Sequence, residues 1–420
     1  VSLEYIAFEH NNAAAELVKL AYDTPPLAFV HSYGCQQNVS DGEKIKGMLS
    51  KVGYEFTSDV NEAQLILYNS CAVRENAEDK VFGKLGDLKH LKENNPELII
   101  GICGCMAQQK HVAEKIKKTY RQVDLVFGTF AYNDMYNMLW EIISKHDRIF
   151  NLSENHVDIN EDFLQLRDDK IRAFVPIMYG CNNFCTYCIV PYVRGREKSR
   201  RPKEILQEIE KLADDGVVEI MLLGQNVNSY GKNLEDEISF AQLLQEVEKI
   251  DKIKRIRFMT SHPKDLSDEL IEVMKNSDKI CRHLHLPLQS GSTKILKAMN
   301  RRYTKEQYLE LAAKIRREIP DISLTTDIMV GFPGETAEDV DDTIDVIRKV
   351  GFDNAFTFIY SVRTGTPAAA MDQVPEEEVH AGFDRVLEAV QETARKQVAR
   401  LQGQTLTALV EEVNEQDAVQ

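Results

Sequence analysis

Short apolar runs alternate with segments of helical spacing along the first 150 residues of the chain. Each apolar run has the length of a strand, and apolar positions that recur every three or four residues follow it. The predicted strands are Leu27–Tyr33, Ala63–Ser70, Leu98–Cys103 and Asp124–Gly128, and the predicted helices are Val39–Lys51, Ala77–Asn94, one that begins near Ala107 and one that ends near Lys145. This alternation predicts crossover connections, and therefore a doubly wound α/β domain with a parallel sheet over residues 1–150.

The same alternation returns after a polar, acidic stretch at residues 151–172, which we interpret as a linker. Further strands are predicted at 174–179, 219–224, 255–260, 283–288, 323–330 and 354–361. Six strand–helix units predict a partial (β/α)6 barrel over residues 173–402, which the long helix Glu376–Leu401 closes. In the last segment, 403–420, Thr405–Val410 alternates like a strand. A lone strand is not a domain, so it either adds to a neighbouring sheet or begins a third domain missing from the sequence.

Three cysteines in one short loop carry the clearest chemical signal. Cys181, Cys185 and Cys188 are spaced C-x3-C-x2-C, in the run C-N-N-F-C-T-Y-C. Three thiolates this close together can bind three irons of a 4Fe-4S cluster and leave the fourth iron open for a reactant. A structural zinc site needs a fourth protein ligand, and its usual signature is two spaced pairs. The spacing therefore favours an iron–sulfur cluster with a vacant coordination site.

Three earlier cysteines follow predicted strands of the first domain. Cys35, Cys71 and Cys105 each fall at the carboxyl end of a strand, beside small or polar residues suited to tight turns. Because ligands of open parallel sheets bind at that edge, we expect the three thiols to converge. The alternative is three unrelated thiols. Cys103, two residues before Cys105, falls within the predicted strand, and Cys281 has no neighbouring ligand signature, so both are predicted to be buried thiols.

Composition narrows the class of protein. The chain has 420 residues, with 43% hydrophobic and 28% charged residues, as in globular proteins. It has no run of ~20 uncharged apolar residues and no visible secretory signal, so we expect no membrane association. Its eight cysteines then suggest ligands or buried thiols of an intracellular protein.

Charge gives an ambiguous signal about partners. A net charge of −16 argues against a polyanionic partner. However, six basic residues and a single acid lie between Arg194 and Lys203. This run is either a solvated loop or a patch that contacts phosphates beside the cysteine loop.

Taken together, these motifs resemble the methylthiotransferases of the radical S-adenosylmethionine (SAM) superfamily over nearly the whole chain. The resemblance rests on the six cysteines in order and on the runs Gly34–Asn38, Asn69–Cys71, Gly104–Met106, Arg194–Arg200 and Leu286–Gly291. Within the family, Gln36–Asp41 and Cys71–Glu78 look most like the MiaB-type tRNA enzymes. Such enzymes carry a small C-terminal β-barrel (TRAM) that grips tRNA. The segment 403–420 would be the start of a truncated TRAM domain.

The resemblance implies two 4Fe-4S clusters and SAM as cofactors. Cys181, Cys185 and Cys188 would hold the cluster that cleaves SAM to a 5′-deoxyadenosyl radical. Cys35, Cys71 and Cys105 would hold an auxiliary cluster that carries or donates sulfur. Tyr187 would pack on the adenine of SAM, and Gln225 and Gln289 would make polar contacts to it.

The implied reaction inserts a methylthio group at carbon 2 of N(6)-dimethylallyladenosine, next to the anticodon of tRNA. A C–H bond on an aromatic carbon is barely acidic, so a cofactor radical suits the reaction better than a general base. Arg194, Arg196, Arg200 and Arg201 would contact phosphates of the anticodon stem-loop. An electron donor is a further implied partner. We expect a cytoplasmic monomer.

Other functions remain open at this point. A related methylthiotransferase could act on threonylcarbamoyl-adenosine in tRNA or on an aspartate of a ribosomal protein. A non-enzymatic iron–sulfur electron carrier would use the same cysteines without a SAM site. A zinc-binding structural protein is a further alternative.

Overall fold

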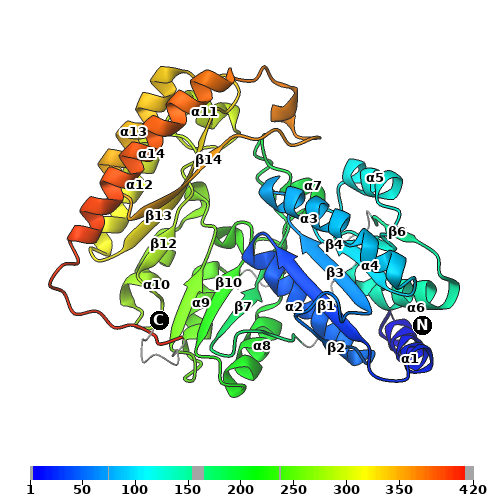
Figure 1. Cartoon of the computed structure of the whole chain (residues 1–420). Coiled ribbons are helices and arrows are strands. Elements are labelled where there is room, and N and C mark those ends of the chain that lie inside the picture. Colours follow the sequence, from blue (N-terminus) through cyan, green and yellow to red (C-terminus); the bar gives the residue numbers. More distant parts are fainter. Residues whose placement is uncertain (1–2, 74, 154–164, 236–237, 412–420) are drawn as a thin grey trace. The chain divides into compact units, whose positions relative to one another are not determined.

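The computed structural model describes residues 3–73, 75–153, 165–235 and 238–411 (Figure 1). The chain divides into two units. The first contains residues 1–168 with the short segments 179–182 and 188–197, and the second contains 169–178, 183–187 and 198–420. The segment that carries Cys181, Cys185 and Cys188 therefore contributes residues to both units.

The first unit is built on a six-stranded parallel sheet in the order β2-β1-β3-β4-β5-β6 (Figure 1). Its strands are β1 (Leu27–Tyr33), β2 (Glu55–Phe56), β3 (Leu65–Ser70), β4 (Ile99–Cys103), β5 (Leu125–Phe127) and β6 (Ile149–Asn151). Its helices are α1 (Leu3–Ala21), α2 (Gln36–Lys51), α3 (Glu75–Asp87), α4 (Lys89–Asn94), α5 (Lys110–Thr119), the 3-10 turn η1 (Tyr132–Asp134), α6 (Met135–Lys145) and α7 (Val190–Arg194). The parallel sheet with crossover helices confirms the predicted fold class.

Both faces of this sheet are covered because successive side chains of a strand point to opposite faces. In β3, Leu65 and Leu67 pack with α1, α2 and α6, whereas Ile66 and Tyr68 pack with α3, α4 and α5. Strands buried on both faces read as continuous apolar runs, as this one does. Helix α1 and the short edge strands β2 and β6 were not predicted, and for the strands the reason is that two or three residues leave almost no periodicity to detect.

The second unit contains two three-stranded parallel sheets, β11-β10-β7 and β12-β13-β14 (Figure 1). Its strands are β7 (Arg172–Pro176), β8 (Met178–Tyr179, which ends in the first unit), β9 (Lys198–Ser199), β10 (Glu219–Leu223), β11 (Arg255–Phe258), β12 (His283–His285), β13 (Ser323–Val330) and β14 (Asn354–Ile359). Ile256 forms a parallel bridge with Ile280, just before β12. The six strands of these two sheets stand where the partial barrel was predicted.

Helices connect these strands. They are α8 (Pro202–Asp214), α9 (Phe240–Glu248), α10 (Asp268–Asn276), α11 (Thr293–Ala298), α12 (Lys305–Glu318), α13 (Ala337–Val350) and α14 (Glu376–Ala399), with 3-10 turns η2 (Val227–Ser229), η3 (Pro263–Asp265) and η4 (Pro367–Ala370). Helix α8 begins at Pro202 as predicted, because proline suits the first helical turn. Its buried stripe, Ile205, Ile209 and Leu212, joins the main core of this unit.

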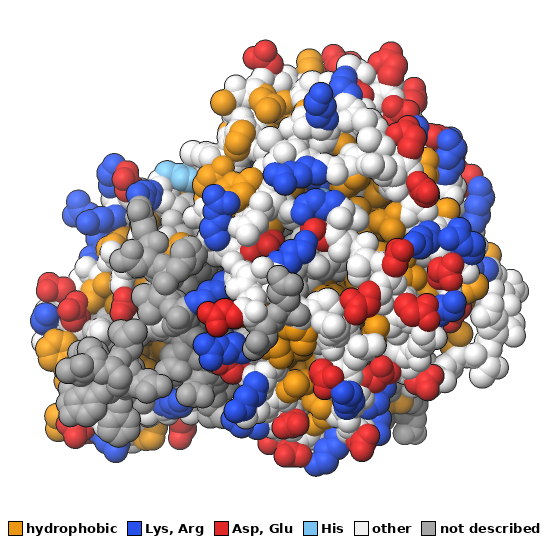
Figure 2. Space-filling view, turned by 180° about the vertical axis from the view of Figure 1, so that it is seen from behind, with side chains coloured by type: hydrophobic (Ala, Val, Ile, Leu, Met, Phe, Trp, Pro, Cys, Tyr) orange, Lys and Arg blue, Asp and Glu red, His pale blue; other side chains and the backbone are white. Residues whose placement is uncertain are grey.

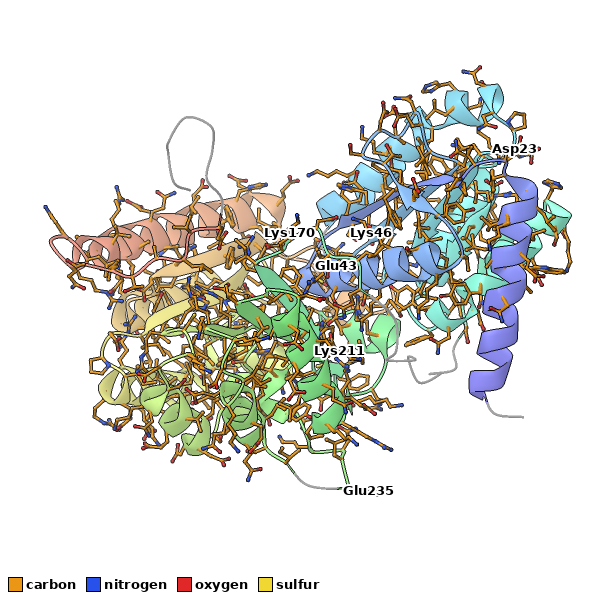
Figure 3. The ribbon with its side chains drawn as sticks, turned by 90° about the horizontal axis from the view of Figure 1, so that it is seen from below. Asp23, Glu43, Lys46, Lys170, Lys211 and Glu235 are labelled. Atoms are coloured by element: carbon orange, nitrogen blue, oxygen red, sulfur yellow. The ribbon has the colours of Figure 1, made fainter. Side chains whose placement is uncertain are left out.

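The first unit extends beyond the predicted boundary at residue 150 because the chain after residue 164 packs on α2. The Leu166 N–H donates to the Glu43 carbonyl at 3.1 Å. Lys46 lies one turn farther along α2 than Glu43, and both are labelled in Figure 3. Lys46 forms a 2.7 Å ion pair with Asp168. Residues 165–168 thus belong to the first unit, and β7 begins inside the predicted linker, at Arg172. Part of that linker, 154–164, lies outside the described residues.

Two smaller predictions were wrong. The alternating segment Thr405–Val410 is not a strand, because residues 404–411 form no ladder with any strand of the described chain. The remainder of the predicted TRAM segment, 412–420, lies outside the described residues. Cys281 is half-buried rather than buried, whereas Cys103 is fully buried as predicted.

No helix in the part of the chain that the structure describes is long and apolar enough to cross a membrane.

Candidate functional site: two groups of cysteines

The three early cysteines follow three neighbouring strands of the first unit. Cys35 lies two residues after β1, Cys71 directly after β3, and Cys105 two residues after β4. In the sheet, β3 stands between β1 and β4. Cys71 and Cys105 are buried, and Cys35 is partly exposed. The cysteines therefore gather at one carboxyl edge of a parallel sheet, the place where ligands of such folds bind.

Glycines next to two of these cysteines allow the turns to approach closely. Gly34 has a φ of +119°, and a Cβ at this position would stand 2.2 Å from Cys71 Cβ. Gly104 has a φ of +90°, and its Cβ would stand 2.3 Å from Asn69 Oδ1. Only glycine meets both demands, a positive φ and the lack of a side chain. The runs G-C-Q-Q-N and G-C-M contain these glycines for a steric reason.

Asn38 connects the early cysteines. Its side-chain oxygen accepts a hydrogen bond from Cys35 Sγ at 3.3 Å and lies 4.0 Å from Cys105 Sγ. Its amide group donates to Asn69 Oδ1 at 3.2 Å, and Asn69 donates in turn to the Asn38 carbonyl at 2.6 Å. Both asparagines are fully buried. This pair fixes the start of α2 against the end of β3, and so fixes the spacing of the thiols.

Arg194 also reaches the early cysteines, from the end of α7 within the first unit. Its Nε donates to Cys105 Sγ at 2.9 Å, and its Nη2 donates to Asn38 Oδ1 at 3.2 Å and to Asp41 Oδ2 at 2.7 Å. The side chains of Arg194 and Asp41 are 6% and 3% exposed, so this is a buried ion pair. A guanidinium therefore stands in direct contact with one thiol of the group.

The thiols differ in acidity because their surroundings differ. A hydrogen bond with Cys71, which outweighs the opposing effect of burial, and the charge of Arg194 lower the pKa of Cys35 to about 6. The same hydrogen bond and burial raise the pKa of Cys71 well above its usual range. Burial raises the pKa of Cys105 to about 11, although Arg194 opposes this shift. Cys35 is thus the thiol most prepared to act as a thiolate ligand.

In the later loop, Cys181 and Cys188 belong to the first unit. Residues 180–182 lie against 195–197: the Cys181 N–H donates to the Gly195 carbonyl at 3.0 Å, and a Cβ on Gly180 would stand 2.1 Å from the Arg196 carbonyl oxygen. Cys181 is buried and Cys188 is half-buried. Cys188 stands just before α7, whose Val193 packs with Cys105 and whose Val193 carbonyl accepts a hydrogen bond from Thr129.

Cys185 belongs to the second unit, where its surroundings hold it firmly. The preceding Phe184 has a φ of +48°, an uncommon conformation for a bulky residue. Asn300 donates to the Phe184 carbonyl at 3.0 Å. The buried Arg301 guanidinium lies 3.8 Å from Cys185 Sγ and donates to the Pro287 carbonyl at 2.8 Å. Each of Cys105 and Cys185 therefore has a buried arginine at its sulfur.

The residues predicted to contact SAM lie in or beside the barrel strands. Tyr187 is half-buried and its ring packs edge-on against Phe332, with 6.5 Å between ring centroids. Gln225 follows β10 and is half-buried. Gln289 is buried, has a φ of +70°, and bridges to Ile328 of β13 through its backbone. All three stand at the carboxyl ends of barrel strands or in the cysteine loop, as predicted, and their contacts with SAM stay a prediction.

The four arginines predicted to contact RNA divide into two pairs. Arg194 and Arg200 are buried, and Arg200 donates to the Pro176 carbonyl at 2.7 Å and pairs with Glu208. These two place their guanidinium groups on partners inside the protein, which is at odds with the predicted phosphate contacts. Arg196 and Arg201 are exposed, and for them the prediction stands. Over the surface visible in Figure 2, basic side chains are interspersed with acidic ones, despite the net charge of −16.

The donor set fits an iron–sulfur cluster better than a single ion. Among the described residues, no group of three or more His, Cys, Asp or Glu side chains is arranged to hold one metal ion. One zinc ion requires all its ligands within ~2.3 Å, whereas a cubane attaches each thiolate to a different iron and so tolerates a wider spacing. Three thiols at one sheet edge, one with a lowered pKa, and a buried cation at a sulfur would suit a negatively charged cluster.

Several residues of the site were not predicted. Asn38, Asp41 and Asn69 are buried polar residues beside the early cysteines. Arg301 is buried as well, and it lies far from Cys185 in sequence. The runs that contain the two asparagines entered the sequence analysis as motifs of the family resemblance, and no role was predicted for the asparagines themselves. A polar residue in an otherwise apolar helix face or strand end is the signal that could have identified them.

Two known protein families match separate parts of the chain. The Radical SAM superfamily matches residues 175–347, and the uncharacterized protein family UPF0004 matches residues 28–128. A radical SAM methyltransferase, TsrM from Kitasatospora setae, solved with cobalamin and a [4Fe-4S] cluster, superposes with a TM-score of 0.60 at 13% identity, covering 82% of this chain and 74% of that one. The cobalamin-dependent radical enzyme OxsB superposes with a TM-score of 0.57 at 12% identity over 88% of this chain and 56% of that one. At such low identity, the likeness concerns the fold.

Curated relatives are much more similar in sequence. The tRNA-2-methylthio-N(6)-dimethylallyladenosine synthase of Lachnoclostridium phytofermentans is 54% identical over 96% of this chain and 89% of its own length. Proteins of the same name from Thermoanaerobacter sp. and Clostridioides difficile are 52% and 54% identical, over 93% and 87% of this chain and 83% and 76% of their own lengths. The chain therefore belongs to the radical SAM methylthiotransferase family, in the branch of the tRNA-2-methylthio-N(6)-dimethylallyladenosine synthases.

Proposed function

We propose that this protein inserts a methylthio group at carbon 2 of N(6)-dimethylallyladenosine, next to the anticodon of tRNA. The similarity to enzymes that bear this name, 54% identity over 96% of the chain, carries the proposal. The gathering of Cys35, Cys71 and Cys105 at one sheet edge supports it independently. A second cysteine group suits an enzyme that needs a sulfur source as well as a SAM site.

Membership of the radical SAM superfamily implies one 4Fe-4S cluster and SAM. We propose Cys181, Cys185 and Cys188 as ligands of this cluster and the early three as ligands of a second one. When bound, the clusters and SAM supply the radical and sulfur chemistry that a carbon–hydrogen bond of an aromatic ring requires. The protein supplies position. Arg301 steadies Cys185, while the asparagine pair and Arg194 hold the early thiols.

The substrate must present an unstacked adenine. A base in a tRNA loop leaves its stack at a cost of a few kcal/mol or less. We propose that Arg196 and Arg201, which are exposed, contact the neighbouring phosphates. The proposal further includes Tyr187, Gln225 and Gln289 as SAM contacts, an electron donor as partner, a monomeric state and a cytoplasmic location, where tRNA is found.

Analysis of tRNA nucleosides tests this function. We expect tRNA from a strain without the gene to lack 2-methylthio-N(6)-dimethylallyladenosine and to accumulate the unmodified N(6)-dimethylallyladenosine. The wild-type gene should restore the modification and the Cys185→Ala gene should not, as measured by liquid chromatography and mass spectrometry.

The same strain separates the alternatives. Loss of methylthio-threonylcarbamoyl-adenosine, or of a methylthio-aspartate in a ribosomal protein, with intact 2-methylthio-N(6)-dimethylallyladenosine would refute the proposed substrate. A non-enzymatic electron carrier is tested with reduced, reconstituted protein and SAM, where the proposed enzyme releases 5′-deoxyadenosine and a carrier releases none.

A further inference from the structure

Arg194 has contacts that its place in a basic surface run did not suggest. It ends α7, is 7% exposed, and lies within the first unit with the early cysteines. One nitrogen donates to Cys105 Sγ and another to both Asn38 Oδ1 and Asp41 Oδ2. Burying a guanidinium is costly unless it meets negative charge.

The charges around this guanidinium already balance without a cluster, so the negative charge of a cluster would be additional. Asp41 already has neutral partners: Gln37 Nε2 at 3.2 Å and the Tyr132 hydroxyl at 3.5 Å. The Arg194–Asp41 pair sums to zero. Three thiolates bound to iron add negative charge at a site that is buried on the Cys71 and Cys105 sides. Of the two charged groups, the Arg194 guanidinium is the one that contacts a cysteine sulfur, so it is the charge nearest to a cluster bound there.

We propose that Arg194 is a positioning residue that compensates the charge of the iron–sulfur cluster held by Cys35, Cys71 and Cys105, and so raises its reduction potential. Reduction adds one negative charge to the cluster, and a cation that donates a hydrogen bond to a ligand sulfur favours the reduced state. Asp41 acts in the opposite direction, because its carboxylate offsets part of the Arg194 charge. This inference rests on the second cluster of the proposed function.

The two charges predict shifts of opposite sign. Replacing Arg194 by glutamine removes the cation and should make the cluster harder to reduce. At a fixed solution potential we expect the ratio of reduced to oxidised cluster to fall about tenfold, equivalent to about 59 mV for a one-electron couple. Replacing Asp41 by asparagine leaves the cation uncompensated and should raise the same ratio. A purely structural role would not reverse sign in this way.

The experiment uses the full chain with Cys181, Cys185 and Cys188 replaced by alanine, so that a cluster can form only at the early cysteines. Iron and sulfide are counted after anaerobic reconstitution, and the midpoint potential is measured by electron paramagnetic resonance during a redox titration. The parent is compared with Arg194→Gln, Arg194→Lys and Asp41→Asn. Arg148→Gln is the matched control, since Arg148 stands directly before β6, at the opposite, amino edge of the same sheet, and donates to the backbone carbonyls of Lys117, Tyr120 and Val123.

The expected result is a lower potential for Arg194→Gln, a higher one for Asp41→Asn, a value near the parent for Arg194→Lys, and no change for Arg148→Gln. Unchanged potentials in Arg194→Gln and Asp41→Asn, with iron retained, would overturn the inference. If Arg194→Gln fails to assemble the cluster, Asp41→Asn decides alone: a raised potential supports the inference and an unchanged one refutes it. A parent that binds no cluster would instead refute the proposed second cluster.

Discussion

At the residue scale, the glycines next to the early cysteines position the thiols because they leave room for the neighbouring strand ends. Gly34 and Gly104 have positive φ angles, and each would collide with a neighbouring strand end if it carried a Cβ. A collision with Cys71 Cβ would move a ligand directly. The backbone at Gly34 is therefore part of the site, although glycine contributes no donor atom.

Gly34→Ala tests this role. We expect the variant to lose the cluster at the early cysteines and with it roughly half of the bound iron and sulfide. Gly216→Ala is the control, since Gly216 also has a positive φ, +97°, but a Cβ added there would meet no heavy atom within 4 Å. The control carries the backbone strain of ~1–2 kcal/mol without the collision. Equal iron loss in both variants would contradict the steric explanation.

His283 provides a prediction about pH. Burial, then the charges of Arg257 and His285, lowers its pKa to about 4, and its Nε2 lies 2.9 Å from Thr325 Oγ1. Because the pKa of His283 is lowered in the folded state, the unfolded chain takes up a proton at this histidine more readily as pH falls. The contribution of His283 to the free energy of unfolding is therefore complete above the unfolded pKa of ~6.5 and is lost as pH falls towards 4. Between pH 7 and pH 5 the contribution of His283 to the free energy of unfolding falls by about 2 kcal/mol.

Urea unfolding of the wild type and of His283→Gln at pH 7 and pH 5 measures this contribution. The wild type should lose more stability on acidification than the variant, because the variant lacks the titrating group. Equal losses of unfolding free energy in the two proteins would show that His283 is not responsible.

At the scale of elements, helix ends and close approaches fix the loops that carry the chemistry. Asp339 caps α13: its carboxylate accepts from the Thr336 N–H at 2.9 Å. The same side chain accepts from Ser292 Oγ at 2.6 Å, at the start of α11. A Cβ on Gly291 would stand 2.4 Å from Thr343 Cα, so the loop before α11 lies directly against α13. The run Leu286–Gly291 contributed to the family resemblance, and these contacts explain its glycine.

Asp339→Asn should destabilise the second unit by about 1–3 kcal/mol, because a buried carboxylate that caps one helix and accepts a hydrogen bond from the start of another loses its charge. Asp341→Asn on the same helix is the control. Asp341 is exposed and pairs with Arg385 at the surface, where such pairs contribute ~1 kcal/mol or less. Thermal unfolding compares the two. A larger loss in the control would contradict the role of the cap.

At the scale of the whole molecule, each unit has its own fold and its own contacts to cysteines. The early group is held by β1, β3, β4, α2 and the end of α7, all in the first unit. Cys185 is held by Asn300 and Arg301 in the second unit. Because the side chains that hold the early thiols differ from those that hold Cys185, we expect each cluster to assemble without the other.

Single substitutions should separate the two clusters. We expect Cys71→Ala to keep about four of about eight irons and to release 5′-deoxyadenosine from SAM without modifying tRNA. Cys185→Ala should keep about four irons as well but release no 5′-deoxyadenosine. Iron counting and chromatography of the SAM products check both. Loss of all iron in either variant would show that the clusters depend on each other.

The sequence by itself determined most of the strands and helices, though not α1, β2 or β6, and it determined the two cysteine groups and the family. The elements follow from local periodicity and the cysteine groups from their spacing and their place after strands, whereas the family rests on the resemblance of the motifs to a known family. Strand β13 and helix α8 lie where the pattern predicted them, and the family assignment is confirmed by the relatives. Only the tertiary structure decided that Arg194 is buried against Cys105, that residues 165–168 pack on α2, and that Thr405–Val410 forms no strand. Burial and pairing depend on contacts between residues far apart in the chain, and local sequence carries no record of them.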